Sequence, residues 1–157
     1  MPKFSWEDKM KLSALTTFIE RDGKILICYG NYYRFERMYG GYSKPHIISA
    51  ENAENNDNML KHIFKIAHEY GHYLSLTLGY WNKYDIGELT EKEINWISGK
   101  EKLFFREKIV LILEEMRAWY LAFGVLKKLK IKLPVLYFAS VALGSVLSYF
   151  IGYFNDS

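Results

Sequence analysis

The pentapeptide His-Glu-Tyr-Gly-His at residues 68–72 constrains this 157-residue chain more than any other feature. Apolar residues around it recur at spacings of three and four, which predicts an amphipathic helix over about 58–78. On such a helix His68 and His72 project from one face a turn apart, so both imidazoles can reach a single metal ion. The rest of the chain must then bring further ligands to this helix.

Glu69 gives this pair of histidines a chemical role. H-E-x-x-H is the pattern of zinc hydrolases, in which the glutamate holds the water at the metal and takes its proton. Ordinary usage of His and Glu would produce the pattern by chance in about one chain of this length in a hundred, or fewer. The sequence therefore predicts zinc at His68 and His72, with Glu69 as the general base.

A third zinc ligand must come from elsewhere, because catalytic zinc usually has three protein ligands and one open position. Glu114 and Glu115 are the candidates, since carboxylates inside the apolar stretch 109–118 need a partner and a cation can be that partner. The alternative is that both glutamates form solvated ion pairs on an exposed helix edge. His62 lies roughly 120 degrees round the helix from the motif and is interpreted, with His46, as a structural or surface residue.

Gly71 is unusual inside a predicted helix, where it costs about 1 kcal/mol relative to alanine. Close approach of another backbone, or of a substrate, would explain it.

Residues 68–72 resemble the H-E-x-G-H motif of the ImmA/IrrE-like prokaryotic and phage proteins, within the gluzincin branch of zinc metallopeptidases. Residues 115–119 are similar to their downstream E-x-x-A-N or E-x-R-A-W segment. The resemblance covers residues 44–123 and implies Glu115 as the third zinc ligand, with Glu114 as the alternative. It also implies an α+β fold of the minimal zincin-like kind, mainly helical with a small antiparallel or mixed sheet.

The same resemblance implies a zinc-dependent metallopeptidase acting on a protein or peptide, with the strand at 45–49 as the edge strand along which substrate lies. The alternative is a non-catalytic zinc-binding regulatory or interaction module of phage or mobile-element type. Trp119 stands where larger gluzincins carry an aspartate that supports a zinc-bound histidine; we expect it to be a core residue. Tyr73, Tyr80 and His46 are the candidates for stabilising the oxyanion.

The remaining elements follow from periodicity and from capping and turn residues. In chain order they are a helix over 6–21 capped by Ser5, a β-hairpin over 24–39, an edge strand over 44–49, a loop over 51–58 ending at a capping residue such as Asp57, a loop over 80–89, a short segment capped by Thr90 with Glu93, a long helical segment over about 100–130, and a helix opened by Pro134.

Residues 133–154 contain no charged side chain and follow the lysine-rich run 127–132. As a helix they would reach roughly 33 Å, long enough to cross a bilayer. Small residues recur every fourth position from Ser140 to Gly152, which suits tight helix packing. We expect a soluble, buried helix that closes the core, and keep a membrane anchor as the alternative.

Composition limits the remaining possibilities. The chain is long enough for one core, so we expect a single domain over residues 1–157. The net charge of +3 is too small to indicate nucleic-acid binding. The single Cys28 excludes an intrachain disulfide framework and fits a reducing compartment. The first eight residues lack a signal-peptide pattern, so we expect a cytoplasmic protein.

Overall fold

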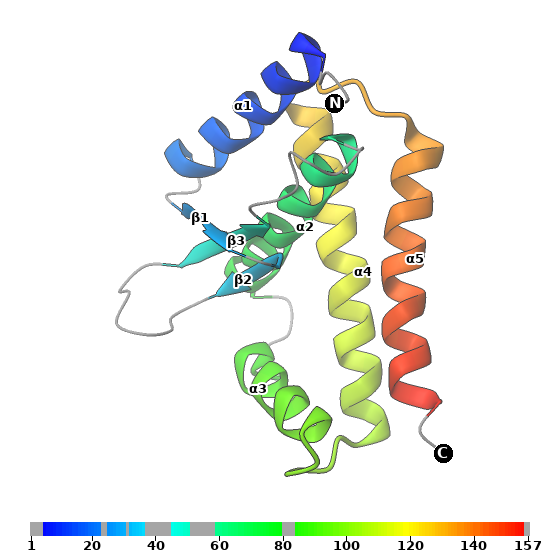
Figure 1. Cartoon of the computed structure of the whole chain (residues 1–157). Helices are drawn as coiled ribbons and strands as arrows, with labels where there is room; N and C mark the ends of the chain where they lie inside the picture. Colours follow the sequence, from blue (N-terminus) through cyan, green and yellow to red (C-terminus); the bar gives the residue numbers. More distant parts are fainter. Residues whose placement is uncertain are drawn as a thin grey trace.

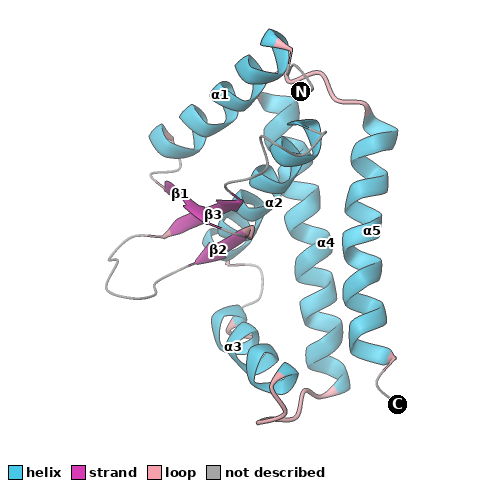
Figure 2. Ribbon diagram, in the orientation of Figure 1, coloured by secondary structure: helices cyan, strands magenta, loops and turns pink. Residues whose placement is uncertain are grey.

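The computed structural model describes residues 5–22, 25–30, 32–36, 45–50, 59–79 and 84–155. Within these ranges the chain is mainly helical with a small mixed sheet, which confirms the α+β expectation (Figures 1 and 2). The elements are α1 (Trp6–Arg21), β1 (Leu26–Gly30), β2 (Arg34–Glu36), β3 (His46–Ala50), α2 (Met59–Thr77), α3 (Ile86–Ile97), α4 (Phe105–Lys128) and α5 (Val135–Phe154).

α2 and α4 pack against each other at the centre of the molecule, with α1 and the sheet on one side and α5 on the other (Figure 1). They approach each other closely at Gly71, where an added Cβ atom would lie 2.1 Å from the carbonyl oxygen of Ala118. Any side chain there would overlap the α4 backbone. The prediction that Gly71 permits close approach of another backbone is therefore confirmed, and the contact fixes the motif helix against the helix that carries Glu115.

The main hydrophobic core lies around this helix pair. Its fully buried side chains come from α1, the sheet, α2 and α4, and include Leu15, Ile19, Ile47, Ile63, Phe64, Ala67, Ala122 and Leu126. Phe138 of α5 closes the core by packing edge-on against Phe64 and Trp119. The core thus fixes α2 and α4, the two helices that supply His68, His72 and Glu115, relative to each other.

The sheet has the order β1-β3-β2, with β1 parallel and β2 antiparallel to β3. The predicted hairpin is wrong, because β1 and β2 both pair with β3 and not with each other. The predicted edge strand is also wrong, because β3 is the central strand. Ile47 is fully buried there, and β3 carries no acidic or lysine side chain that would require an edge position.

Helix starts were predicted with mixed success. Ser5 caps α1 as expected, with its hydroxyl oxygen accepting from the Asp8 amide at 3.1 Å. α3 begins before Thr90, so that predicted cap is wrong. Asp85 takes the role by accepting from the Glu88 amide at 3.2 Å, while Thr90 lies inside the helix. The predicted cap at Asp57 lies outside the described residues.

α5 begins after Pro134 as predicted, but it is not the buried helix that we expected. Only Phe138 and Tyr153 are buried, and Leu136 is 88% exposed. One side of α5 packs on α4 and α2, and nothing in the described chain covers the other. Among the described residues, α5 is the one helix long and apolar enough to cross a membrane.

Candidate metal centre

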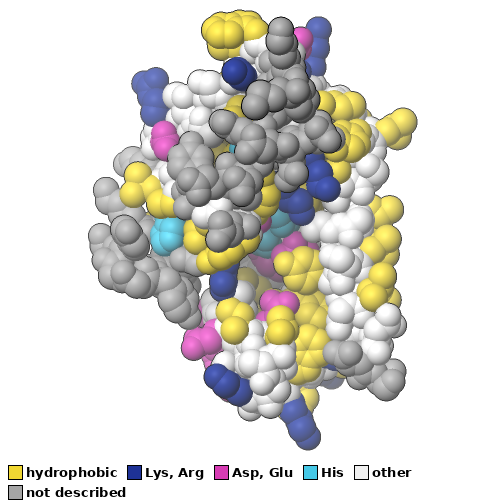
Figure 3. Space-filling view, viewed as in Figure 1, with side chains coloured by type: hydrophobic (Ala, Val, Ile, Leu, Met, Phe, Trp, Pro, Cys, Tyr) yellow, Lys and Arg dark blue, Asp and Glu magenta, His cyan; other side chains and the backbone are white. Residues whose placement is uncertain are grey.

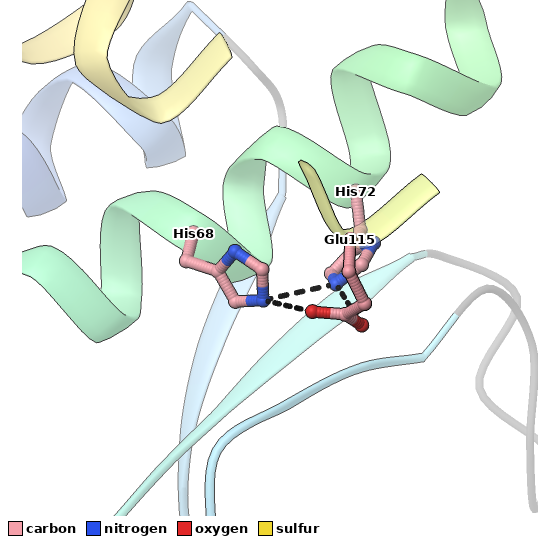
Figure 4. Close-up of side chains that lie close together, drawn as sticks. All are labelled: His68, His72 and Glu115. Atoms are coloured by element: carbon pink, nitrogen blue, oxygen red, sulfur yellow. Dashed lines mark hydrogen bonds and ion pairs between the residues drawn. The ribbon is translucent and has the colours of Figure 1, made fainter. Parts of the chain in front are cut away.

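Three predicted ligands converge between α2 and α4 (Figure 4). His68 Nε2 lies 3.1 Å from His72 Nε2 and 3.1 Å from Glu115 Oε2. His72 Nε2 lies 3.3 Å from Glu115 Oε1. Ligand atoms around a tetrahedral zinc, with bonds of about 2.0–2.1 Å, are separated by about 3.4 Å. The three side chains are therefore spaced as one small metal cation requires.

The donor chemistry also fits a cation. Two imidazole nitrogens and a carboxylate point at one another, and all three carry lone pairs when His68 and His72 are neutral. Glu115 Oε2 is buried, and its contact within the described chain is the one with His68 Nε2. A buried carboxylate needs compensation, which a shared metal ion provides together with its two nitrogen ligands. This group can hold a metal.

Glu114 has a different position from Glu115. Its Oε1 lies 3.2 Å from His72 Nδ1, and its Oε2 accepts the Ser75 hydroxyl at 2.7 Å. A carboxylate at Nδ1 keeps the proton there and leaves Nε2 free to bind a metal. Both glutamates are buried, at 3% and 7% exposure, so the alternative of solvated pairs on a helix edge is wrong.

His68 is oriented by stacking. Its ring lies on the indole of Trp119, with centroids 4.2 Å apart and planes 21° apart. Trp119 is buried in the main core, as predicted. His68 Nδ1 is buried, and no described group bonds to it. The two histidines are thus held by different means, one by an aromatic face and the other by a carboxylate.

Burial and neighbouring charges shift the pKa values of the ionisable groups in the centre in different directions. Burial lowers the pKa of His68, and the neighbouring His72 lowers it further. Burial also opposes charge on His72, but Glu115 and Glu114 outweigh it and raise the pKa of His72 well above its usual value. Burial would raise the pKa of Glu115, yet the His72 cation outweighs burial and lowers it. Metal binding would replace the proton on His72.

Glu69 lies next to the ligands on α2, 7% exposed, and lines the same cavity. The cavity has a volume of about 400 Å³. Its walls come from β2, α2, α3, α4 and α5, and Figure 3 shows acidic and histidine side chains within a hollow on this face. The structure therefore brings the predicted base and the predicted ligands to one open site.

The cavity also contains residues that sequence reasoning missed. Tyr149 lies within reach of Glu115, and burial together with nearby carboxylates raises the pKa of its phenol. The Tyr153 hydroxyl donates to Glu93 Oε1 at 2.5 Å. Arg34 of β2 lines the same cavity. The two tyrosines lie four positions apart in α5, but in a uniformly apolar helix that spacing does not reveal which side faces inward.

Two of the three residues predicted to stabilise an oxyanion, Tyr73 and His46, are not brought to the site. Tyr73 packs against Phe35 and Tyr70, and His46 is buried in β3. Neither is among the described residues that line the cavity. Tyr80 lies outside the described residues. His62 contacts the Tyr33 hydroxyl through Nδ1 at 2.5 Å, which agrees with the structural role expected for it.

Comparison of the chain with protein-family models, with curated proteins and with solved structures finds no match.

Proposed function

We propose that this chain is a zinc-dependent metallopeptidase of the small gluzincin type. The observation that supports it most is the convergence of His68, His72 and Glu115 on one point, with Glu69 beside them in an open cavity. Two histidines and a carboxylate that leave a coordination position open are typical of hydrolytic zinc sites. Glu114 supports His72 in the way that carboxylates support zinc-bound histidines.

Zinc, when bound, would supply Lewis acidity toward the attacking water and the scissile carbonyl. Glu69 takes the proton from that water and delivers it to the amine nitrogen of the leaving peptide, so the products are a carboxylic acid and an amine. We assign the Tyr149 phenol, which lines the cavity close to Glu115, as the hydrogen-bond donor to the oxygen that gains negative charge. It replaces Tyr73 and His46 as our candidate for that role.

The substrate lies along β2, because β3 is enclosed between two strands and its edges are already paired. Among the described strands β2 pairs with β3 alone, and residues 33–35 line the cavity. An extended peptide can add to such an edge by main-chain hydrogen bonds. Leu76, Ile86, Ile94 and Leu111 form an apolar part of the cavity wall. It would accept an apolar side chain next to the scissile bond.

The decisive experiment measures bound metal and peptide hydrolysis in wild type and in Glu69→Gln. We expect one zinc per chain in both proteins and at least about 100-fold less hydrolysis in the variant, as is usual when a general base is removed. Glu91→Gln is the control, because Glu91 is an exposed carboxylate on the rim of the same cavity. It should retain both zinc and activity.

Two outcomes would contradict the proposal. Zinc in both proteins with hydrolysis in neither would leave the non-catalytic zinc-binding module suggested by the sequence. Iron in place of zinc would exclude the zinc peptidase, since two histidines and a carboxylate also suit non-haem iron.

A further inference from the structure

The outer side of α5 is the largest departure from ordinary burial among the described elements. A helix that is apolar all round is normally enclosed by protein or by lipid. The inner side of α5 packs on α2 and α4, whereas its outer side exposes large apolar side chains, namely Val135, Leu136, Leu143, Leu147, Phe150 and Ile151. We call these six residues the apolar face. Figure 3 shows it as hydrophobic side chains along the edge where α5 lies, with no charged side chain among them.

Exposed side chains of α4 extend this surface. Phe123 contacts Phe138 of α5, and Met116 lies seven residues earlier, on the same side of α4. Met116 is 51% exposed. Patches of this kind on a soluble chain mark surfaces that contact a protein or a membrane.

Charge distinguishes between these two partners. Lys127, Lys128, Lys130 and Lys132 are all exposed, and they lie at the end of α4 and in the turn that leads into α5. Lys128 Nζ also lies over the Phe18 ring of α1, 5.1 Å from its centroid. Residues 133–154 contain no carboxylate, so a second copy packed along α5 would offer these lysines no counter-charge from that helix. Anionic lipid headgroups would supply it, next to acyl chains that match the apolar face.

We propose that the apolar face and the adjacent lysines dock this protein on an anionic lipid bilayer. α5 lies on the bilayer and does not cross it, because its inner side is committed to the rest of the chain. Tyr153 donates to Glu93, and the Tyr153 carbonyl accepts from Lys108 Nζ at 2.6 Å. Removing α5 into lipid would break these hydrogen bonds and expose Phe64 and Trp119 of the core.

Docking in this geometry holds the cavity beside the membrane, because Tyr149 and Tyr153 line the cavity from the inner side of the same helix. The inference does not rest on peptidase activity. It is tested by binding, which can be measured whether or not the chain hydrolyses peptides.

The experiment is co-sedimentation of the full chain with vesicles of phosphatidylcholine alone or mixed with phosphatidylglycerol. We expect binding to the mixed vesicles, weaker binding to phosphatidylcholine alone, and release by salt. Each of Lys130→Gln and Lys132→Gln should weaken binding about fivefold. Leu143→Ser should weaken binding about tenfold or more. Because Leu143 is exposed, we expect the variant to keep its fold, which circular dichroism checks.

Two matched controls should bind like wild type. Leu26→Ser removes an exposed leucine from β1, which lies on the opposite side of the α2 and α4 pair from α5 (Figure 1). Lys102→Gln removes an exposed lysine near the other end of α4.

Three results would overturn the proposal. The first is no binding, or equal binding to both kinds of vesicle. The second is a stable dimer in solution that Leu143→Ser dissociates, which would assign the apolar face to a second copy. The third is resistance of the bound chain to extraction at alkaline pH, which would assign α5 to a membrane span.

Discussion

The interface between α2 and α4 and the outer side of α5 depart from ordinary burial in opposite directions. The interface buries His68, Glu114 and Glu115, groups that water normally solvates. α5 exposes leucines such as Leu136 and Leu143, which proteins normally bury. In our proposals each departure is balanced by a partner outside the polypeptide, a metal cation in the first region and a lipid surface in the second. Both proposals therefore rest on departures from ordinary burial and not on the fold class.

The largest expected effect on stability comes from adding one methyl group at the interface between α2 and α4. In Gly71→Ala the new Cβ atom would meet the backbone of Ala118, which cannot rotate away as a side chain can. We expect a loss of about 3 kcal/mol, the upper part of the range for overpacking, and a fall in Tm of roughly 10 °C. Thermal unfolding followed by circular dichroism measures it.

Gly124→Ala on α4 is the control for that experiment, because its Cβ would meet no heavy atom of the described chain within 4 Å. It should leave Tm unchanged or raise it slightly. Equal melting temperatures for the two variants would show that α2 and α4 are not in close contact.

The next largest effect concerns the two buried glutamates. Glu114→Gln keeps an oxygen for the Ser75 hydroxyl but removes the charge beside His72 Nδ1. We expect zinc affinity to fall about 10- to 100-fold, as for other groups that support a ligand, and to fall further in Glu115→Gln. Competition with a chelator measures both.

Ser75→Ala is the matched control, since it leaves the contact between Glu114 and His72 in place. Its effect should be smaller than that of Glu114→Gln. A greater loss of zinc in Glu114→Gln than in Glu115→Gln would reverse the roles of the two glutamates.

A third prediction concerns Glu93 and Tyr153, where α3 meets α5 at the cavity. Burial raises the pKa of Glu93, although the Tyr153 hydroxyl acts against this. The folded state therefore keeps this proton to higher pH than the unfolded state does. The stability it contributes is present below the unfolded pKa of about 4.3 and is lost as pH rises through the folded pKa.

Glu93→Gln removes that dependence and still accepts from the tyrosine. At pH 7 we expect the variant to be more stable than wild type by about 1 kcal/mol, with no difference near pH 4. Urea unfolding across this pH range measures it, and Tyr153→Phe, which leaves the carboxylate without its donor, should destabilise. A variant less stable than wild type at pH 7 would show that the carboxylate is stabilised by charges around it.

Much of the helical framework was predictable because its signals are local. Ser5 caps α1, Pro134 precedes α5, and the four-residue spacing of His68 and His72 puts both on one face whatever the helix packs against. The strand order was not predictable, because it depends on β3 pairing between two strands that precede it in the chain. The turn residues that suggested a hairpin over 24–39 do not determine which strands pair with each other.

The candidate site was predictable in part for the same reason. Glu114 and Glu115 lie about 100 degrees apart on α4, so sequence alone indicates that one of them faces the motif. Both reach it because Gly71 lets α4 approach α2 closely. Glu115 then faces the Nε2 atoms of His68 and His72, and Glu114 faces His72 Nδ1. Tyr149 was missed because the apolar pattern around it does not distinguish inside from outside.

The smallest expected effect concerns another glycine, Gly144, on the outer side of α5. Gly144→Ala adds the same methyl group as Gly71→Ala, but its Cβ would meet no heavy atom of the described chain within 4 Å. Alanine is the better helix former, so we expect a gain of about 0.5 kcal/mol in unfolding free energy and unchanged vesicle binding. If a second copy packed closely along this helix, the methyl group would clash there and the variant would lose stability in a concentration-dependent way. Thermal unfolding at two protein concentrations distinguishes these outcomes, because a free or lipid-facing helix predicts the same small gain at both.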